Sequence, residues 1–461
     1  MNKPKIITYM IILWAYFICL QLFFPRALGS QLQLGIDRLF TDFTGNWLLL
    51  GPFIGLVILV LIGPMYFGLH FLATLEPRYH PKEFFHPDIS IMIASKDEKA
   101  LLKQTLDTIL DSDYPKDKMQ IILIVSGSTD GSAEFFEGYA KDHDSVEWKI
   151  ISKDMPKKGK PTALNAGLKE VKHDFLVIYD AGCKVTKDTL KILVAPMKDE
   201  KHHATIGPVV VENWKTNSLT KGILVDYALI SGGSMYGEVK NNLGSNCNIY
   251  GKNFCIRTAL LRELGGFDEE ALTEDLYLTA MLKLHEKKIR FVPKAKAYEP
   301  VPETWEILDK QRTRWMGGYK EDAPRIMEKQ VGKRSGQKII IMRNLSMLFL
   351  AHVDIFAVVD WVLIPLFFLV GLLAGEWYMF MYVLSCAIFK YGYLINAIRK
   401  YGDGHYSALG YLWMCAKIHL VMFAKQFPGG LPEEISWEKT PMILERSKEE
   451  IDALASSAKE S

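Results

Sequence analysis

Cysteine is scarce in this chain, and its six residues do not pair along the sequence. No two of them have a CxxC spacing, so neither a zinc site nor a disulfide framework is indicated. Positive charge is not in excess either, because the formal net charge is only +2. That balance gives no support to nucleic-acid binding, which calls for a basic patch. The glycine-rich signatures GxGxxG and GxxxxGKS/T are also missing, which leaves dinucleotide-binding and P-loop proteins without support.

Long apolar runs are present at both ends of the chain. Residues 6–24 and 47–75 carry no charge and are long enough to cross a bilayer as helices. Near the other end, 355–375 and 377–398 form a second apolar pair. Four membrane spans are therefore predicted.

Two further segments, 338–353 and 405–427, mix apolar with basic residues and are predicted to lie in the membrane interface. Basic residues gather beside the spans on one side, whereas the 25–46 loop holds only two. The positive-inside rule then places the N-terminus, the middle domain and the C-terminal tail in the cytosol. We expect a multi-pass protein of the plasma (inner) membrane. A fifth span at 405–427 would put the tail outside. The predicted organisation is two N-terminal spans in 1–80, a soluble domain in 85–330, membrane and interface helices in 335–430, and a tail in 431–461.

The soluble middle is predicted to be an α/β domain. Apolar runs at 89–94, 121–125, 148–151 and 175–179 alternate with amphipathic segments such as 98–111 and 162–171, as the sequence shows. Continuous apolar strands separated by helices indicate a mainly parallel sheet covered on both faces.

Polar residues follow each of these strands, and ligands collect at the carboxyl ends of such strands. Ser95 to Glu98 follow the first strand and Ser126 to Ser132 the second. After the third comes a Lys- and Gly-rich turn, 157–161, at the start of a helix, where free backbone N–H groups and lysine both favour a pyrophosphate. Asp180 ends the fourth strand and could place a divalent cation beside phosphate oxygens.

Further along are Gly265-Gly266-Phe267-Asp268, Thr273-Glu274-Asp275 and Gln311-Arg312-Thr313-Arg314-Trp315, and Trp437-Glu438-Lys439-Thr440 follows the last apolar segment. In this order, these segments resemble glycosyltransferase family 2. The likeness is strongest to its membrane-integrated synthases of β-linked polysaccharides such as hyaluronan, chitin, cellulose and poly-N-acetylglucosamine. It covers roughly residues 85–330 by motif, including the TED and QxxRW elements, and it implies a GT-A domain. The last segment resembles a WxKT element found in many of these enzymes.

The resemblance implies a role for each matching residue. Asp275 would be the general base of an inverting transfer, with Glu274 beside it. Asp180 would hold Mg²⁺ or Mn²⁺ against the diphosphate, and Arg314 would add positive charge near the leaving group. The other residues assigned to substrate binding are Ala94, Ser95, Glu98, Ser126, Asp130, Lys160, Asn165, Thr273, Gln311, Arg312 and Trp315.

Two positions depart from the family pattern, since Ser126 and Gly182 each stand where an acid is common. The expected donor is a UDP-sugar, with UDP-N-acetylglucosamine and UDP-glucose favoured, and selectivity is expected to involve Asn246–Phe254. The acceptor would be a glycan or a lipid-linked sugar, with membrane lipids around the chain and no nucleic acid. The leading hypothesis is a processive hexosyltransferase that passes a β-linked glycan through its own helices. The alternatives are a non-processive transferase that adds one sugar to a lipid, and a catalytically silent scaffold.

Overall fold

The computed structural model describes residues 7–16, 67–155, 159–331, 369, 377–425 and 430–432. The strands are β1 (Ile89–Ala94), β2 (Met119–Ile124), β3 (Glu147–Ile151), β4 (Phe175–Asp180), β5 (Lys184–Val185), β6 (Ala204–Ile206), β7 (Val209–Val211), β8 (Phe254–Arg257), β9 (Ile289–Phe291) and β10 (Ala297–Glu299). The helices are α4 (Lys99–Leu110), α5 (Ser132–Asp142), α6 (Lys160–Glu170), α7 (Thr189–Val194), α8 (Ser218–Asp226), α9 (Met235–Asn242), α10 (Thr258–Glu263), α11 (Glu274–Leu284), α12 (Trp305–Val331), α16 (Trp377–Tyr401) and α17 (Leu412–Ala424).

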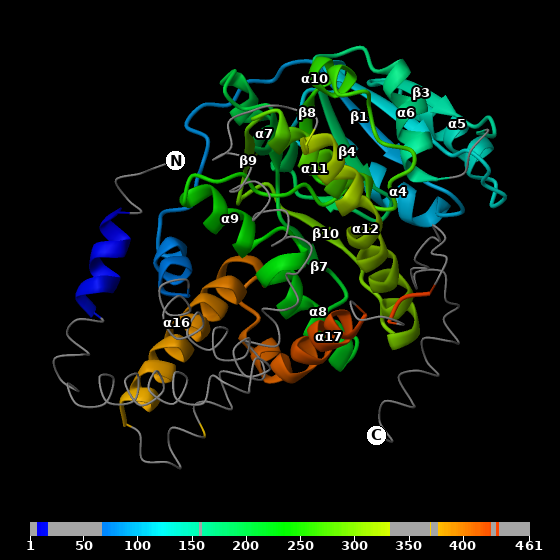
Figure 1. Ribbon diagram of the computed structural model, residues 1–461. Coiled ribbons are helices and arrows are strands. Elements are labelled where there is room, and N and C mark those ends of the chain that lie inside the picture. The colour runs from blue at the N-terminus through cyan, green and yellow to red at the C-terminus, as the bar shows by residue number, and fades with distance from the viewer. Residues whose placement is uncertain are drawn as a thin grey trace.

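The main sheet has the strand order β3-β2-β1-β4-β8-β6-β9. Strands β3, β2, β1 and β4 run parallel, β8 runs antiparallel to both of its neighbours, and β6 is parallel to β9. A smaller sheet has the order β5-β10-β7. The mainly parallel α/β fold predicted from the sequence is therefore confirmed, and Figure 1 shows the sheet with its helices.

Side chains of the parallel strands alternate between two hydrophobic cores. Ile91 and Ile93 of β1 belong to one core, together with Leu106 of α4. Met92 belongs to the other, together with Leu164 of α6. A strand that is buried on both faces needs apolar residues at most positions, which is why β1, β2 and β4 could be recognised as mainly apolar runs.

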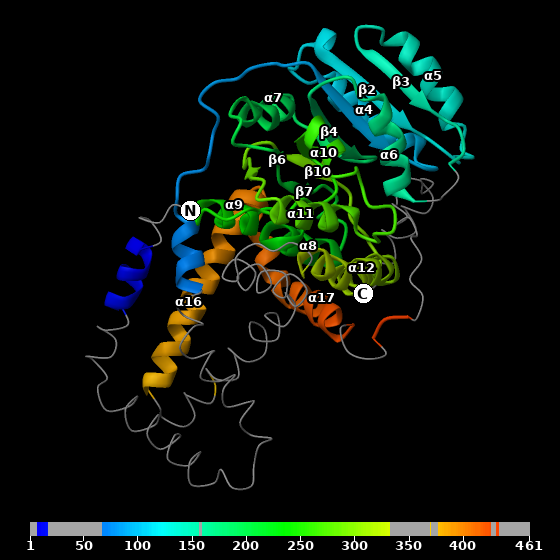
Figure 2. The ribbon, with the colours of Figure 1, turned by 45° about the horizontal axis from the view of Figure 1, so that its top comes forward.

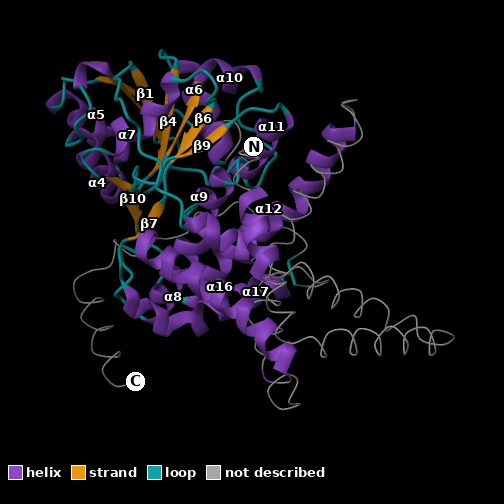
Figure 3. Cartoon of the chain, turned by 90° about the vertical axis from the view of Figure 1, so that its left-hand side faces the viewer, coloured by secondary structure: helices purple, strands orange, loops and turns teal. Residues whose placement is uncertain are grey.

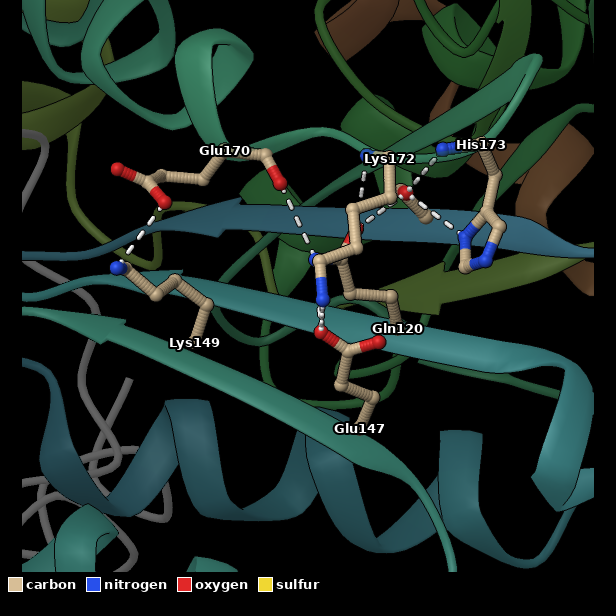
Figure 4. A network of polar contacts seen from close by, with 7 residues as sticks. Gln120, Glu147, Lys149, Glu170, Lys172 and His173 are labelled. Atoms are coloured by element: carbon tan, nitrogen blue, oxygen red, sulfur yellow. Dashed lines mark hydrogen bonds and ion pairs between the residues drawn. The ribbon is translucent and has the colours of Figure 1, made fainter.

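A polar network joins the strands at their amino ends, opposite the ends that carry the predicted site (Figure 4). Gln120 of β2 is buried, accepts hydrogen bonds from Ser90 Oγ (2.6 Å) and Lys172 N (3.2 Å), and donates to the Glu170 carbonyl at 3.1 Å. Ion pairs join Lys172 to Glu147, and Lys149 to Glu170. The buried polar groups of Gln120 thus have partners, as such groups require.

Apolar helices from the two ends of the sequence pack together beside the α/β domain. Helix 7–16 contacts α16 through Tyr16, whose hydroxyl lies 2.5 Å from Ser385 Oγ. Helix 67–74 stacks Phe71 on Phe389 of α16 at 5.9 Å. Figures 1 and 2 show α16 on the same side of the sheet as α17, and Figure 3 shows the strands gathered away from these helices.

The domain and the apolar helices are joined by buried polar contacts. Lys400 of α16 forms an ion pair of 3.1 Å with Glu238 of α9, and Tyr401 Oη donates to the same carboxylate at 2.6 Å. One helix in the described part of the chain, Tyr406–Ala424, is long and apolar enough to cross a membrane by length and composition. The predicted 338–353 and 355–375 segments, the WxKT element and most of 6–24 and 47–75 lie outside the described residues.

Candidate functional site

Hydrogen bonds join the loops after β1 and β2 to each other. Asp97 has a φ of +53° and accepts hydrogen bonds from Thr129 N at 2.6 Å and Thr129 Oγ1 at 3.2 Å. Asp97 N in turn donates to Ser128 Oγ at 3.1 Å. Asn and Asp tolerate this left-handed conformation better than most residues. The two loops therefore form one rigid edge at the carboxyl ends of the parallel strands.

Asp130 holds the starts of two helices in this edge. Its carboxylate accepts from Lys99 N at 2.9 Å, in the first turn of α4, and from Ser132 N at 3.1 Å, in the first turn of α5. Burial alone would raise the pKa of Asp130, but these hydrogen bonds outweigh it and the pKa lies below its ordinary value. The carboxylate predicted to bind substrate thus has backbone partners of its own.

Four other residues predicted to bind substrate lie at the same edge. Ala94 ends β1 and pairs in register with Asp180, the last residue of β4. Ser95 Oγ donates to Glu98 Oε2 at 3.3 Å, and Ser126 Oγ accepts from Met155 N at 3.1 Å. The structure brings these side chains together as the sequence predicts, because their strands end at one edge of the sheet.

The ammonium group of Lys160 lies among oxygens from three different segments. Its Nζ is 2.7 Å from Asp180 Oδ1, 3.1 Å from Glu274 Oε1 and 3.3 Å from the Gly251 carbonyl oxygen. Burial would lower the pKa of Lys160, but the two carboxylates outweigh it and raise the pKa above its usual value. Lys160 is thus charged, and it links β4 to the start of α11.

A second ammonium group faces Asp180 from the loop before β8. Lys252 Nζ is 3.8 Å from Asp180 Oδ2 and forms a close ion pair with Glu299 of β10. Tyr227 Oη donates to the other oxygen of Glu299 at 3.0 Å. Burial would raise the pKa of Asp180, but Lys160, Lys252 and Arg314 keep it below its ordinary value.

Asp275 has the opposite environment. Burial is the largest influence, and with the neighbouring charge of Glu274 it raises the pKa of Asp275 to about 7, against the smaller effects of Lys160 and Arg314. Gly251, at a φ of +72°, packs closely here, since a Cβ at this position would lie 3.2 Å from Asp275 Oδ2. Two nearby aspartates, Asp180 and Asp275, therefore have pKa values displaced in opposite directions.

Two predicted substrate-binding residues hold protein loops in place. Asn165 Nδ2 donates to the Phe267 carbonyl at 2.8 Å, and Asn165 Oδ1 accepts from Phe267 N at 2.8 Å. Thr273 Oγ1 donates to Asp322 of α12 at 2.9 Å. Burial raises the pKa of Asp322 to about 6. Asn165 thus fixes the loop before the TED element, and Thr273 joins that element to α12.

The QxxRW residues lie along α12 and have separate environments. Arg312 is 2% exposed and pairs with Asp226 of α8 at 2.8 Å, while its guanidinium carbon lies 4.1 Å from the centre of the Trp315 ring. His419 of α17 lies 2.9 Å from the other oxygen of Asp226. The Arg312 side chain, predicted to bind substrate, is thus committed to a buried ion network that joins α8, α12 and α17.

Gln311 is 7% exposed, and no hydrogen-bond partner for its Oε1 is found in the described part of the structure. Arg314 lies close enough to affect both Asp180 and Asp275 electrostatically. Figure 1 shows α12 passing beside α11 and reaching towards α17. Helix α12 therefore carries Arg314, which lies near the acidic cluster of Asp180, Glu274 and Asp275, and Arg312, which belongs to the ion network with α8 and α17.

Metal ligands are few at this site. Within the described ranges, no group of three His, Cys, Asp or Glu side chains is arranged to hold a metal ion. Asp180 and Glu274 do converge on one cation, the Lys160 ammonium, with a carbonyl oxygen as third partner. Carboxylate and carbonyl oxygens are the ligands that Mg²⁺ and Mn²⁺ prefer, so the donor set suits such an ion although an ammonium group fills it.

Sequence reasoning missed several of these residues. Lys252 and Gly251 lie in the Asn246–Phe254 segment that was expected to affect selectivity, but nothing in the sequence placed it against Asp180. No motif pointed to Glu299, Asp226 or His419, whose partners are far away along the chain.

A family model described as "Glycosyltransferase like family 2" matches residues 86–318, about half of the chain. The chain belongs to this family. The TED and QxxRW residues described above fall inside the matched span.

Among curated relatives of this family 2 chain, two are named after different products and one is named only as a glycosyltransferase. Probable glycosyltransferase YdaM of Bacillus subtilis is 32% identical over 255 residues, covering 54% of this chain and 60% of YdaM. Poly-β-1,6-N-acetyl-D-glucosamine synthase of Staphylococcus epidermidis is 30% identical over 237 residues, covering 50% and 55%. β-Monoglucosyldiacylglycerol synthase of Nostoc sp. is 28% identical over 258 residues, covering 55% and 54%. The chain thus spans little more than half the length of the curated relatives it matches.

Among solved structures, mannosyltransferase PcManGT from Pyrobaculum calidifontis, in complex with GDP-Man and Mn²⁺, has a TM-score of 0.50 and 18% identity. The likeness covers 73% of this chain and 97% of that one. At this identity it shows the fold, an α/β GT-A-like glycosyltransferase fold.

Proposed function

We propose that this glycosyltransferase is a membrane enzyme that transfers a sugar from a UDP-sugar to a growing β-linked polysaccharide, with inversion at the anomeric carbon. The observation that carries the proposal is that Lys160 joins Asp180 to the TED element, since its Nζ lies 2.7 Å from Asp180 Oδ1 and 3.1 Å from Glu274 Oε1. Asp180 is held ionised beside Lys160 and Lys252, whereas the pKa of Asp275 is raised to about 7. Pairs of carboxyl groups whose environments separate their pKa values are typical of sites with distinct charge-binding and acid–base roles.

Asp275 is the proposed general base. An acceptor hydroxyl attacks the anomeric carbon, its proton goes to the Asp275 carboxylate, and the bond to the diphosphate breaks so that UDP leaves. A base with a pKa near 7 is well matched to neutral pH. Glu274 contributes a neighbouring negative charge that keeps the pKa of Asp275 high.

The donor diphosphate is proposed to bind beside Asp180, Lys160 and Arg314. Lys160 begins α6, and a helix N-terminus favours an anion. Asp180, with the Glu274 carboxylate nearby, would hold Mg²⁺ or Mn²⁺, and such an ion supplies positive charge that stabilises the leaving diphosphate. The loops after β1 and β2, which hydrogen bonds join, would bind the uridine together with Ala94, Ser95 and Glu98.

The acceptor is proposed to approach along α12, past Gln311 and Trp315. Gln311 carries a buried carbonyl oxygen that a sugar hydroxyl could satisfy. Trp315 is partly exposed, and its ring also packs on Arg312. Arg312, Asn165 and Thr273 are assigned to positioning these elements, because their side chains already have protein partners.

Exposed apolar side chains support a membrane location. Large apolar residues of helix 7–16 are open to solvent, among them Ile11 (62%) and Trp14 (59%), and Ile388 of α16 is 56% exposed. Such contiguous exposed surface marks an interaction site, and here lipid suits it. Helix α17 is proposed to lie in the interface, since Met414, Cys415 and Ile418 are buried while Trp413 is 58% exposed. We propose a multi-pass protein with its catalytic domain and both termini in the cytosol.

The second candidate function is transfer of a single sugar to a lipid acceptor. The specific observation in its favour is the similarity to β-monoglucosyldiacylglycerol synthase, which covers as much of this chain as the similarity to the polysaccharide synthase does. The two functions differ in the product that is released.

The deciding experiment is an incubation of the purified protein with radiolabelled nucleotide sugars and Mg²⁺ or Mn²⁺. A high-mass product that a β-glycosidase degrades is the expected result. A single labelled lipid extracted by organic solvent would replace the polysaccharide synthase with the lipid transferase. Binding of UDP without turnover of any donor would indicate a silent scaffold.

A further inference from the structure

The ammonium of Lys160 stands where a cation bound to Asp180 would stand. Its Nζ lies 2.7 Å from Asp180 Oδ1 and 3.1 Å from Glu274 Oε1, and the Gly251 carbonyl completes a set of three oxygens. The side chain of Lys160 is only 15% exposed, and that of Glu274 only 6%. Lys160 is therefore enclosed rather than lying loosely over the site.

Two cations cannot share this position. A Mg²⁺ or Mn²⁺ ion needs its carboxylate oxygen at about 2.1 Å, which is the space that the ammonium fills. Repulsion between two positive charges a few ångströms apart in a buried site opposes their binding together. The second oxygen of Asp180 offers no free alternative, because Lys252 lies 3.8 Å from it.

We propose that Lys160 is a positioning residue that occupies the cation position while the donor is absent and yields it when donor and metal bind together. This inference rests on the proposed function. On binding, the ammonium leaves Asp180 and transfers to a diphosphate oxygen, for which its flexible four-carbon stem is suited. The donor-free protein then binds metal weakly, and metal and nucleoside diphosphate bind cooperatively.

Charge supports this order of events. Asp180, Glu274, Asp275 and Glu299 carry up to four negative charges, against Lys160, Lys252 and Arg314. Without ligand, the charges of the three basic side chains nearly balance those of the acidic side chains. Replacing the Lys160 ammonium by a metal ion alone therefore gains little free energy. A diphosphate brings the negative charge that can accept the displaced ammonium, and the metal then has a vacant oxygen set.

The test is a Mn²⁺ titration of the donor-free full-length protein, followed by electron paramagnetic resonance. We expect Lys160→Met to bind Mn²⁺ at least about tenfold more tightly than the wild type, the scale on which neighbouring groups tune metal sites. Adding Asp180→Asn to Lys160→Met should remove the gain. Saturating UDP should tighten Mn²⁺ binding strongly in the wild type and much less in Lys160→Met.

The matched control is Lys252→Met, which removes a positive charge near the same carboxylate but leaves the Lys160 ammonium in place. Equal tightening by the two variants would show a general charge effect and overturn the proposal, as would no tightening in Lys160→Met. If Lys160→Met does not fold, Lys160→Gln retains donor hydrogen bonds without the charge and should also bind Mn²⁺ more tightly.

The wild type alone also tests the proposal. A Mn²⁺ affinity that is equally high with and without UDP would contradict displacement of the Lys160 ammonium by the metal. Failure of the proposed function gives a different pattern. The high-mass glycan would then be missing from the incubation with labelled nucleotide sugars, while the donor-free comparison of Lys160→Met with Lys252→Met would still report on Lys160.

Discussion

At the scale of single residues, Asp275 is the side chain whose removal should separate chemistry from binding. Asp275→Asn keeps the shape of the group but cannot take up the acceptor proton, so transfer should fall by about 10²-fold or more. UDP binding, measured by calorimetry, should stay close to that of the wild type. Asp144→Asn, a change at an exposed carboxyl, is the control and should leave turnover unaltered. Near-normal transfer by Asp275→Asn would rule out the base assignment.

The raised pKa of Asp275 also makes a prediction about stability. The folded chain holds this proton more tightly than the unfolded chain, since the pKa rises from 3.8 to about 7 on folding. The free energy of unfolding contributed by Asp275 therefore falls as pH rises between about 4 and 7. Asp275→Asn should raise Tm by about 2 °C or more at pH 8 and change it little at pH 4. A gain of equal size at both pH values would contradict the raised pKa.

At the scale of elements, helix α6 approaches the sheet at a glycine. A Cβ on Gly167 would lie 2.4 Å from Met92 Sδ and 2.8 Å from Ile124 Cδ1. Gly167→Ala should overpack this contact and lower stability by about 1–3 kcal/mol. The same change at Gly138 of α5, where no described atom lies within 4 Å of the added carbon, should stabilise by about 0.5–1 kcal/mol. Thermal melting of the two variants should move in opposite directions.

The ion network of α8, α12 and α17 makes a second prediction at this scale. Burial opposes ionisation of Asp226, but Arg312 and His419 lower its pKa to about 2. Asp226→Ala would leave Arg312 buried and unpaired, which typically costs about 3–5 kcal/mol. We expect a large fall in Tm and loss of transfer. Lys103→Met breaks an exposed pair of 2.7 Å and should change Tm little; a similar effect of both variants would contradict the account.

The elements that the sequence predicted are those with local signals. The first four strands were placed within two residues; β1, β2 and β4 are buried on both faces and mainly apolar, whereas β3, at the edge of the sheet, is only partly buried. Strands β5 to β10 have two to four residues and carry no such signal. Motifs identified Asp180, Glu274 and Asp275 as site residues. Lys252 could not be identified in this way, because it contacts Asp180, which lies far from it along the chain. Arg312 was assigned to substrate binding because a motif identifies a residue but not its partner. In the structure that partner is Asp226.

At the scale of the whole molecule, the proposed arrangement with four membrane spans predicts on which side the C-terminus lies. A fluorescent protein fused after Ser461 should fluoresce, because four spans put the tail in the cytosol. A fusion after Val331, the end of α12, is cytosolic with either four or five spans and is the matched control. A dark Ser461 fusion beside a bright Val331 fusion would show that Tyr406–Ala424 crosses the membrane.

Helix α12 contacts parts of the molecule that lie far apart in the sequence. Asp322 holds Thr273 of the TED element, and Arg312 holds Asp226 beside α17. A random genetic screen for inactive alleles would therefore recover many positions along α12. Few of those alleles would identify sugar contacts, since most would disturb the spacing between Glu274 and Asp275 at one end of α12 and helices α8 and α17 at the other. Suppressor mutations should then arise in α8, α11 or α17, on the opposite side of each broken contact.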